Sequence, residues 1–324
     1  MRTTEPKKRQ LEIDRPSGIH DPLVSVILAV HNREGSVARA IASVLAQTYP
    51  HLELIVVDDG STDSTRVVVE RFGDRVTLIA QAHAGVYPAR NRGLRHARGE
   101  LVAFIDSDDA WLSDKLAAQV QLMRRPEVGL VFGDVVHVTA PHEGAPRTGL
   151  TSFRVAPPRR GRAARHFAWC NFVPTTTVLV RRACLEEVGG FSEANELSAD
   201  YLAWFRVALR HELDYIDRPV AEYTVHAGGI SFDLGRSLAA RIDLFSAELA
   251  QTTDPATRAL LRQLLFNLSL HLALALLRGR ARNVPHPLQL VWRTASSMAR
   301  FEAAAWTAAF AIDQMRMRTR RLFS

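Results

Sequence analysis

Residues 101–111 read LVAFIDSDDAW, an apolar run that ends in three aspartates and a serine before Ala110 and Trp111. The run has the length and the β-branched and aromatic content of a strand that is covered on both faces. VSVILAV (Val24–Val30) and LELIVVDD (52–59) repeat the pattern upstream, and residues at helical spacing follow each. Strands that alternate with helices at this distance predict an α/β fold with a mainly parallel central sheet flanked by helices.

The same periodicities predict the remaining elements and the domain boundaries. Helices are expected at 35–47, 61–72, 86–97, 114–124 and 199–210, and strands at 76–80, 128–132, 213–217 and 220–225. Residues 140–166 are rich in proline, glycine and arginine, which predicts a mobile loop. We divide the chain into a flexible leader (1–22), an α/β domain (23–234) and an all-helical extension (235–324), whose helices are expected at 234–251, 255–279 and 287–318.

The charge is distributed unevenly between these parts. The chain has 41 basic and 34 acidic residues, a net charge of +7. Residues 235–324 hold 13 arginines, no lysine and five acidic residues, so this extension carries +8 and the rest of the chain carries −1. A nucleic-acid-binding body would be basic and would carry an aromatic and basic motif, which we do not find. We therefore expect no nucleic-acid partner.

Cysteine content and hydropathy indicate the compartment. The two cysteines, Cys170 and Cys184, provide neither a disulfide framework nor metal-ligand spacing. Residues 1–22 lack the apolar core of a secretory signal, and no uninterrupted run of about 18 apolar residues occurs. These features predict a cytoplasmic protein without a spanning helix.

Carboxylates gather where the predicted strands end. Asp58 and Asp59 end the second strand, and Asp106 and Asp108 follow a later one. Ligands of open α/β sheets bind at the carboxyl ends of the strands, and carboxylates two residues apart can converge on one hard divalent cation. The alternative is that both clusters only cap helices and form turns. The chain lacks GxGxxG and GxxxxGK[ST] motifs, so we expect a diphosphate to be held through a metal.

Several spaced motifs resemble one family. They are VSVILAVHNREGSVARAIASVLAQTYPHLELIVVDDGSTDST (24–65), QAHAGVYPARNRGLRHARGELVAFIDSDDAW (81–111), VPTTTVLVRRACLEEVGGFSE (173–193), ADYLAWFRVA (199–208) and YTVHAGGIS (223–231). Over about residues 22–232 the chain resembles the inverting family 2 glycosyltransferases, which have a GT-A fold. The resemblance implies a nucleotide-diphosphate-sugar donor, Mn²⁺ or Mg²⁺ as cofactor, and a hydroxyl group of a glycan or lipid-linked acceptor.

The resemblance also implies roles for individual residues on the donor side. Asp59, with Asp58 beside it, would accept a hydrogen bond from the imide N–H of the base, which favours a UDP-linked donor. Asp106 would face the ribose and the metal, and Asp108 the metal and the diphosphate, with Asp109 able to replace either. The other donor-binding residues implied in this way are Ala29, Val30, His31, Glu34, Arg90, Asn91 and Ser107. His226 would lie near the diphosphate and metal, or it is structural.

On the acceptor side, the resemblance implies that Asp200 is the general base. The family has a Glu-Asp pair here, but Ala199 replaces the glutamate in this chain. This departure leaves open an alternative function, a non-catalytic nucleotide-sugar-binding subunit. Asp200 itself could be only a helix cap. Residues 174–177 and Trp169 or Trp204 belong either to the acceptor side or to a plain strand and the core.

The basic extension has three interpretations. Its leucine-rich, arginine-ended helices could lie on an anionic membrane at the inner face, which would bring the enzyme to a lipid-linked acceptor in polysaccharide biosynthesis of the cell envelope. They could instead pack against the α/β domain, or form a dimer interface.

Overall fold

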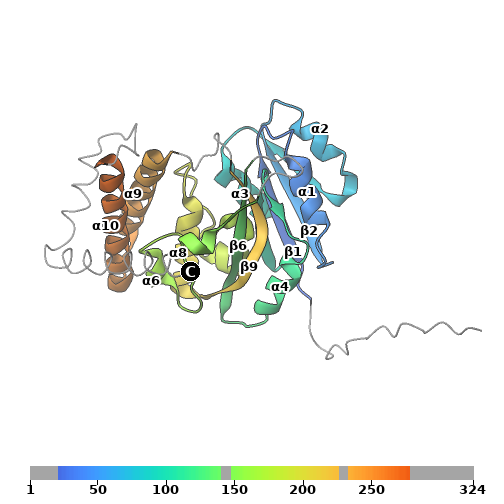
Figure 1. Ribbon diagram of the computed structural model, residues 1–324. Helices are drawn as coiled ribbons and strands as arrows, with labels where there is room; N and C mark the ends of the chain where they lie inside the picture. Colours follow the sequence, from blue (N-terminus) through green and yellow to red (C-terminus); the bar gives the residue numbers. More distant parts are fainter. Residues whose placement is uncertain (1–20, 140–146, 226–232, 278–324) are drawn as a thin grey trace, which may run out of the picture.

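In the first half of the chain, strands alternate with helices and pair with one another in parallel. In a computed structural model, which describes residues 21–139, 147–225 and 233–277, the sheet has the order β3-β2-β1-β4-β8-β6-β9-β5, with β7 paired to β6 (Figure 1). The strands are β1 (Val24–Val30), β2 (Leu52–Asp59), β3 (Thr77–Gln81), β4 (Leu101–Asp106), β5 (Ala110–Trp111), β6 (Val128–Thr139), β7 (Arg147–Thr151), β8 (Leu179–Arg181) and β9 (Glu212–Val225).

Helices cover both faces of this sheet (Figure 1). They are α1 (Val37–Leu45), α2 (Thr65–Glu70), α3 (Val86–His96), α4 (Lys115–Leu122), α5 (Ser152–Val155), α6 (Ala164–Phe167), α7 (Arg182–Glu187), α8 (Ala199–Arg210), α9 (Leu234–Gln251) and α10 (Pro255–Leu277), with 3₁₀ turns at Gly73–Arg75 and Thr175–Thr177. Side chains of β1 alternate between the faces: Val26 and Leu28 pack with α1 and α4, and Ile27 packs with α3 and α8. Both faces of β1 are therefore buried, as its continuous apolar sequence predicts.

The sheet is mixed in its second half. β1 to β4 pair in parallel, whereas β8 runs antiparallel to β4 and β6, and β5 runs antiparallel to β9. The two strands predicted at 213–217 and 220–225 are one strand, β9, which follows β6 with register shifts. The sequence shows two short apolar runs because Asp217, Arg218 and Pro219 separate them, and one register shift falls at these residues.

The prediction of a mobile loop at 140–166 is wrong for its described part. Residues 147–151 form β7 on the edge of β6, and two short helices follow. Phe153 packs edge-to-face on Phe132, and Phe167 is fully buried. The segment is ordered in spite of its proline and glycine residues, because these aromatic side chains pack into the core.

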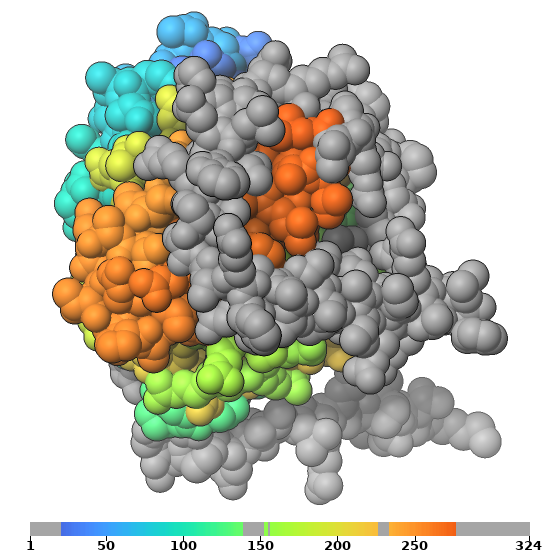
Figure 2. Space-filling view, turned by 90° about the vertical axis from the view of Figure 1, so that its left-hand side faces the viewer, coloured from blue at the N-terminus to red at the C-terminus, as the bar shows by residue number. Residues whose placement is uncertain are grey.

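The extension packs against the α/β domain. Leu238, Phe245 and Leu261 belong to the same buried cluster as α8, and the Phe245 ring lies 5.0 Å from that of Tyr201. Arg206 of α8 forms an ion pair with Glu248 of α9. Figure 2 views this side and shows α9 and α10, in orange, forming one flank of the molecule. Of the three interpretations, the described helices match the second; the helix predicted at 287–318 lies outside the described residues.

Helix α10 is the one described helix that is long and apolar enough to cross a membrane. Its best window has a mean hydropathy of 1.5, and 44% of that window is buried in the protein. Asn267, near its middle, donates to the carbonyl of Ala168 (2.7 Å). Core helices of globular proteins pass the same test of length and composition.

A lysine is buried beneath the sheet. Lys115 of α4 is 0% exposed, with its ammonium 3.8 Å from the centroid of the Trp111 ring. Its one hydrogen-bond acceptor among the described residues is Gln119 Oε1 (2.9 Å). Burial lowers the pKa of Lys115 well below its usual range.

We predict that Lys115→Met is more stable than the wild type at pH 7 and that this advantage shrinks as the pH rises toward 10. The unfolded chain has a lysine pKa of about 10.4. Between the lowered pKa of native Lys115 and that value, the unfolded chain binds more protons than the native protein, so wild-type stability rises with pH. Thermal unfolding of both proteins from pH 6.5 to 10 measures the difference, and Gln121→Met, on the exposed face of α4, is the control. A difference that stays constant with pH would show that Lys115 is charged in the fold.

Candidate active site

The sheet register brings the predicted donor-side residues to one edge. Val30 pairs with Asp58 across β1 and β2, and Ala29 pairs with Asp106 across β1 and β4. The parallel strands end together, so the carboxylates after β2 and β4 flank the end of β1. Val30 is buried, and Ala29 is partly buried.

His31 and Glu34 tie the loop after β1 to the loop after β2. His31 Nδ1 hydrogen-bonds the carbonyl of Asp59 (2.8 Å), and its ring stacks on that of His83 with centroids 4.1 Å apart. The carboxylate of Glu34 accepts from the backbone N–H of Ser64 (2.8 Å). Both residues therefore form the wall at the ends of β1 and β2 where the nucleoside is expected.

The carboxylate of Asp59 holds the turn before α3. It is 2% exposed and accepts from Gln81 Nε2 (2.6 Å) and from the backbone N–H groups of Ala84 (2.9 Å) and Gly85 (2.8 Å). A carboxylate at this place is favoured by the positive end of a helix. Asp59 therefore anchors the start of α3 through these hydrogen bonds. That Asp59 also accepts a hydrogen bond from the nucleobase of the donor stays a prediction.

The carboxylate of Asp58 accepts fewer hydrogen bonds from the described residues than that of Asp59. Its Oδ1 accepts from the backbone N–H of Ser61 (3.0 Å), and none of the described donors bonds to Oδ2. Gly60 lies between Asp58 and Ser61 in this turn and has a φ of 73°. It has space only for a hydrogen, because a Cβ would come within 2.7 Å of the His83 backbone nitrogen. The Asp58 turn is therefore packed directly against the turn that Asp59 holds.

Arg90 of α3 forms a buried ion pair with Asp106. Its guanidinium lies 2.5 Å from Asp106 Oδ1 and over the rings of Tyr87 and Phe191, at 5.5 and 5.7 Å. Burial raises the pKa of Asp106, Arg90 opposes this, and the charges of Asp108 and Asp200 add to it. One arginine thus faces more negative charge than it can balance.

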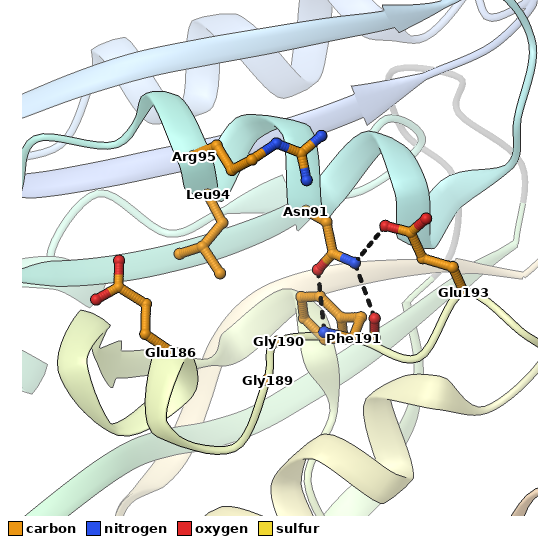
Figure 3. Close-up of a pocket in the computed structure, with 8 residues that line it drawn as sticks. All are labelled: Asn91, Leu94, Arg95, Glu186, Gly189, Gly190, Phe191 and Glu193. Atoms are coloured by element: carbon orange, nitrogen blue, oxygen red, sulfur yellow. Dashed lines mark hydrogen bonds between the residues drawn. The ribbon is translucent and has the colours of Figure 1, made fainter.

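Asn91, the next residue, has other partners. Its amide donates to the carbonyl of Phe191 (2.8 Å) and to Glu193 (2.7 Å), and its oxygen accepts from the N–H of Phe191 (3.0 Å). Figure 3 shows these bonds beside a surface pocket of 450 Å³ that Asn91 lines together with Arg95. Neighbouring side chains of a helix point about 100° apart, so Arg90 faces Asp106 whereas Asn91 faces the surface pocket. That Asn91 lies near the nucleotide stays a prediction.

Asp108 and Asp109 point to different environments. Asp109 is 1% exposed and accepts from the backbone N–H of Thr224 (2.9 Å); burial and the charges of Asp106 and Asp108 raise its pKa well above the usual range. Asp109 therefore faces the fold, contrary to the expectation that it could replace its neighbours. Ser107 is buried as well. Of these four residues, Asp106 and Asp108 are the two that are partly exposed at the edge of the sheet.

These two carboxylates fit a divalent cation that also binds a diphosphate. Within the described ranges no group of three or more histidine, cysteine or acidic side chains could hold a metal alone, and His226 lies outside them. Mg²⁺ in particular is commonly held by one or two carboxylates together with substrate phosphates. The unbalanced negative charge around Asp106 is what such a cation would neutralise.

Asp200, the predicted residue of the acceptor side, lies in the first turn of α8. Its Oδ1 accepts from the Tyr87 hydroxyl (3.1 Å) and its Oδ2 from the Thr175 hydroxyl (2.6 Å). Burial raises the pKa of Tyr87 well above its usual range, and the charge of Asp200 adds to this, so Tyr87 stays a donor. Ala199 is fully buried. Asp200 is therefore held from two elements besides its own helix, which a simple cap does not require.

Sequence reasoning did not identify Tyr87. It lies three residues before Arg90, on the same face of α3, and this spacing was the available signal. Residues 175–177 form a 3₁₀ turn rather than a strand. Trp204 is fully buried, which favours the core interpretation of that residue.

Comparisons with known proteins agree with this geometry. The sequence model of the family described as Glycosyl transferase family 2 matches residues 25–189. An Escherichia coli UDP-Glc:alpha-D-GlcNAc-diphosphoundecaprenol beta-1,3-glucosyltransferase, WfgD, is 41% identical over 116 residues, which are 35% of this chain and 46% of that protein. An uncharacterized glycosyltransferase of Nostoc sp. is 32% identical over 63% of this chain and 65% of that protein. The chain thus spans about half to two thirds of the length of these relatives.

Solved structures share the fold. The mannosyltransferase PcManGT from Pyrobaculum calidifontis, in complex with GDP-Man and Mn²⁺, has a TM-score of 0.61 at 24% identity, over 93% of this chain and 83% of that one. The Staphylococcus aureus protein TarS, residues 1–349, in complex with UDP-GlcNAc, has a TM-score of 0.59 at 20% identity, over 83% and 78%. The fold is therefore GT-A.

We predict that Arg90→Met lowers the free energy of unfolding by about 1–3 kcal/mol. The change leaves Asp106 partly buried without its cation, and the loss is smaller than for a fully buried pair because a third of the Asp106 side chain is exposed. Chemical denaturation measures this value. Arg95→Met, one turn along α3 on the exposed side, should change it by less than about 0.5 kcal/mol. Equal effects of the two variants would contradict the importance of the ion pair.

Proposed function

Because the chain belongs to glycosyl transferase family 2, we propose that it transfers a sugar from a nucleoside-diphosphate donor to a hydroxyl group of an acceptor, with inversion at the anomeric carbon. The observation that carries this proposal is that one turn of α3 contacts carboxylates of both sides: Arg90 pairs with Asp106, and Tyr87 donates to Asp200. We infer that the donor-side and the acceptor-side carboxylates face one reaction site.

The proposed donor is UDP-linked. Asp58 keeps Oδ2 without a described donor, so it is better placed than Asp59 to accept from the imide N–H of uracil. The stacked rings of His31 and His83 and the loop held by Glu34 would surround the nucleoside. The name of WfgD, which gives UDP-Glc as the donor, supports the same choice.

Asp106 and Asp108 would hold Mn²⁺ or Mg²⁺ together with the diphosphate; His226, the third proposed ligand, lies outside the described residues. A bound divalent cation would neutralise the charge that develops on the departing nucleoside diphosphate. PcManGT was solved with Mn²⁺, which supports this assignment. Arg90 opposes the rise that burial causes in the pKa of Asp106 and would hold this carboxylate in place on the donor side.

Asp200 would act as the general base. It would take the proton of the acceptor hydroxyl as the oxygen attacks the anomeric carbon from the face opposite the diphosphate. A single displacement of this kind inverts the anomeric configuration, and general-base assistance contributes about 10²–10⁴-fold to such a step. The sugar–oxygen bond to the diphosphate breaks as the new glycosidic bond forms.

The proposed acceptor is a glycan or a lipid-linked sugar of envelope polysaccharide biosynthesis. WfgD is named for a diphosphoundecaprenol-linked acceptor, which supports this class. The extension, with a net charge of +8, would favour peripheral contact with an anionic membrane at its cytoplasmic face. A dimer formed through the extension is the alternative use of the same helices.

We predict that Asp200→Asn retains donor binding and loses transfer by at least about 10²-fold, because an amide cannot accept the proton. Release of UDP from UDP-sugars in the presence of Mn²⁺ and acceptor measures the rate, and calorimetry measures donor binding. Asp217→Asn, at an exposed position of β9, should keep the wild-type rate. Full transfer by the Asp200 variant would contradict its assignment as the base. A wild type that binds donor but releases no UDP would favour the non-catalytic subunit.

We predict that Asp108→Ala loses the Mn²⁺-dependent part of donor binding. In the wild type, removal of Mn²⁺ by EDTA should weaken UDP binding measured by calorimetry, and in the variant the two titrations should coincide. Asp114→Ala is the matched control, since this exposed aspartate pairs with Arg218 away from the cleft. A variant that still binds UDP more tightly with Mn²⁺ would contradict Asp108 as a ligand.

A further inference from the structure

The carboxylate of Asp200 is oriented by donors on three elements. Tyr87 of α3 and Thr175 of the 3₁₀ turn bond to different oxygens, and the backbone N–H of Tyr201 (2.9 Å) adds to Oδ1. Oδ2 thus has one described donor, Thr175, and at 2.6 Å this is the shortest of the three bonds. Hydrogen bonds from a hydroxyl to a carboxylate are shorter and stronger than neutral ones.

The direction of the Thr175 bond is fixed by a second bond. The Trp204 indole nitrogen lies 3.2 Å from Thr175 Oγ1. An indole N–H can only donate, so the threonine oxygen accepts from it and must direct its single hydrogen elsewhere. Asp200 Oδ2 is the one acceptor of that hydrogen among the described residues. Trp204 therefore keeps Thr175 a donor to Asp200.

The parts of this chain of bonds are rigid. Trp204 is fully buried and packs against Phe104 and Phe191, and Thr175 is 8% exposed. Trp204 follows Asp200 by one turn of α8, so both ends of the chain of bonds belong to the same helix. Since Ala199 offers no polar group, the orientation of Asp200 depends on residues outside its immediate sequence.

We propose that Thr175, oriented by Trp204, is a positioning residue that holds Asp200 with its reactive oxygen toward the acceptor hydroxyl; this rests on the proposed function. Thr175 itself does not touch the reacting atoms. Its loss would let the carboxylate rotate about Tyr87 and Tyr201, and a displacement of about 1 Å at a reacting group can cost about 10²-fold in rate. Donor binding, on the other side of the cleft, would not change.

The test compares Thr175→Val, Thr175→Ser and Thr177→Val. Thr177 is the matched control: it is fully buried in the same turn, and its hydroxyl donates to the Pro174 carbonyl (2.7 Å) and not to Asp200. We expect Thr175→Val to lower kcat about 10–100-fold with the donor KM within threefold of the wild type. Thr175→Ser should restore kcat to within threefold, and Thr177→Val should keep it while reducing the melting temperature.

Folded Thr175→Val with wild-type kcat, or Thr175→Ser as slow as Thr175→Val, would overturn the proposal. A crystal structure of Thr175→Val gives a readout that does not depend on activity. The Asp200 carboxylate should rotate so that Oδ2 leaves its position beside residue 175, and a carboxylate in the wild-type orientation would also count against the proposal. An inactive wild type would instead reject the proposed function, which separates the two failures.

Discussion

The position of helix α3 is the constraint on which the cleft depends. One turn of this helix carries Tyr87, which bonds to Asp200, and Arg90, which pairs with Asp106. The start of the same helix is bonded by Asp59 from the end of β2. A rigid turn of about 5.4 Å thus sets the spacing between the donor-side and the acceptor-side carboxylates. Asp59 matters here as the anchor of the helix.

Clustered carboxylates explain why this anchoring is needed. Burial and the charges of Asp108 and Asp200 raise the pKa of Asp106, and Arg90 is the cation that opposes them within the described residues. Without a fixed partner, these groups would separate or take up protons. The ion pair therefore balances part of the negative charge of the site, and the remaining charge would favour the proposed divalent cation.

The sequence was sufficient to predict the parallel half of the fold and the place of the aspartates. Continuous apolar runs specify buried strands, and parallel strands end at one edge, so Asp58 and Asp106 had to lie near the end of β1. The pairing of the second half could not be predicted, because β8 pairs antiparallel with β4 and β9 pairs in parallel with β6, and both partners are distant in the chain. Tyr87 was missed, and Thr175 was named only within residues 174–177, because their bonds to Asp200 link distant residues: Tyr87 is 113 residues from Asp200, and no local pattern marks such a bond.

The central proposal is that the edge formed by β1, β2 and β4 binds a nucleoside diphosphate through Asp106 and Asp108. A crystal structure of the protein with UDP and Mn²⁺, with anomalous scattering recorded for manganese, tests it directly. We predict an anomalous peak between these two carboxylates and the diphosphate, with uracil beside Asp58. UDP bound at another surface, or manganese held by other residues, would contradict it.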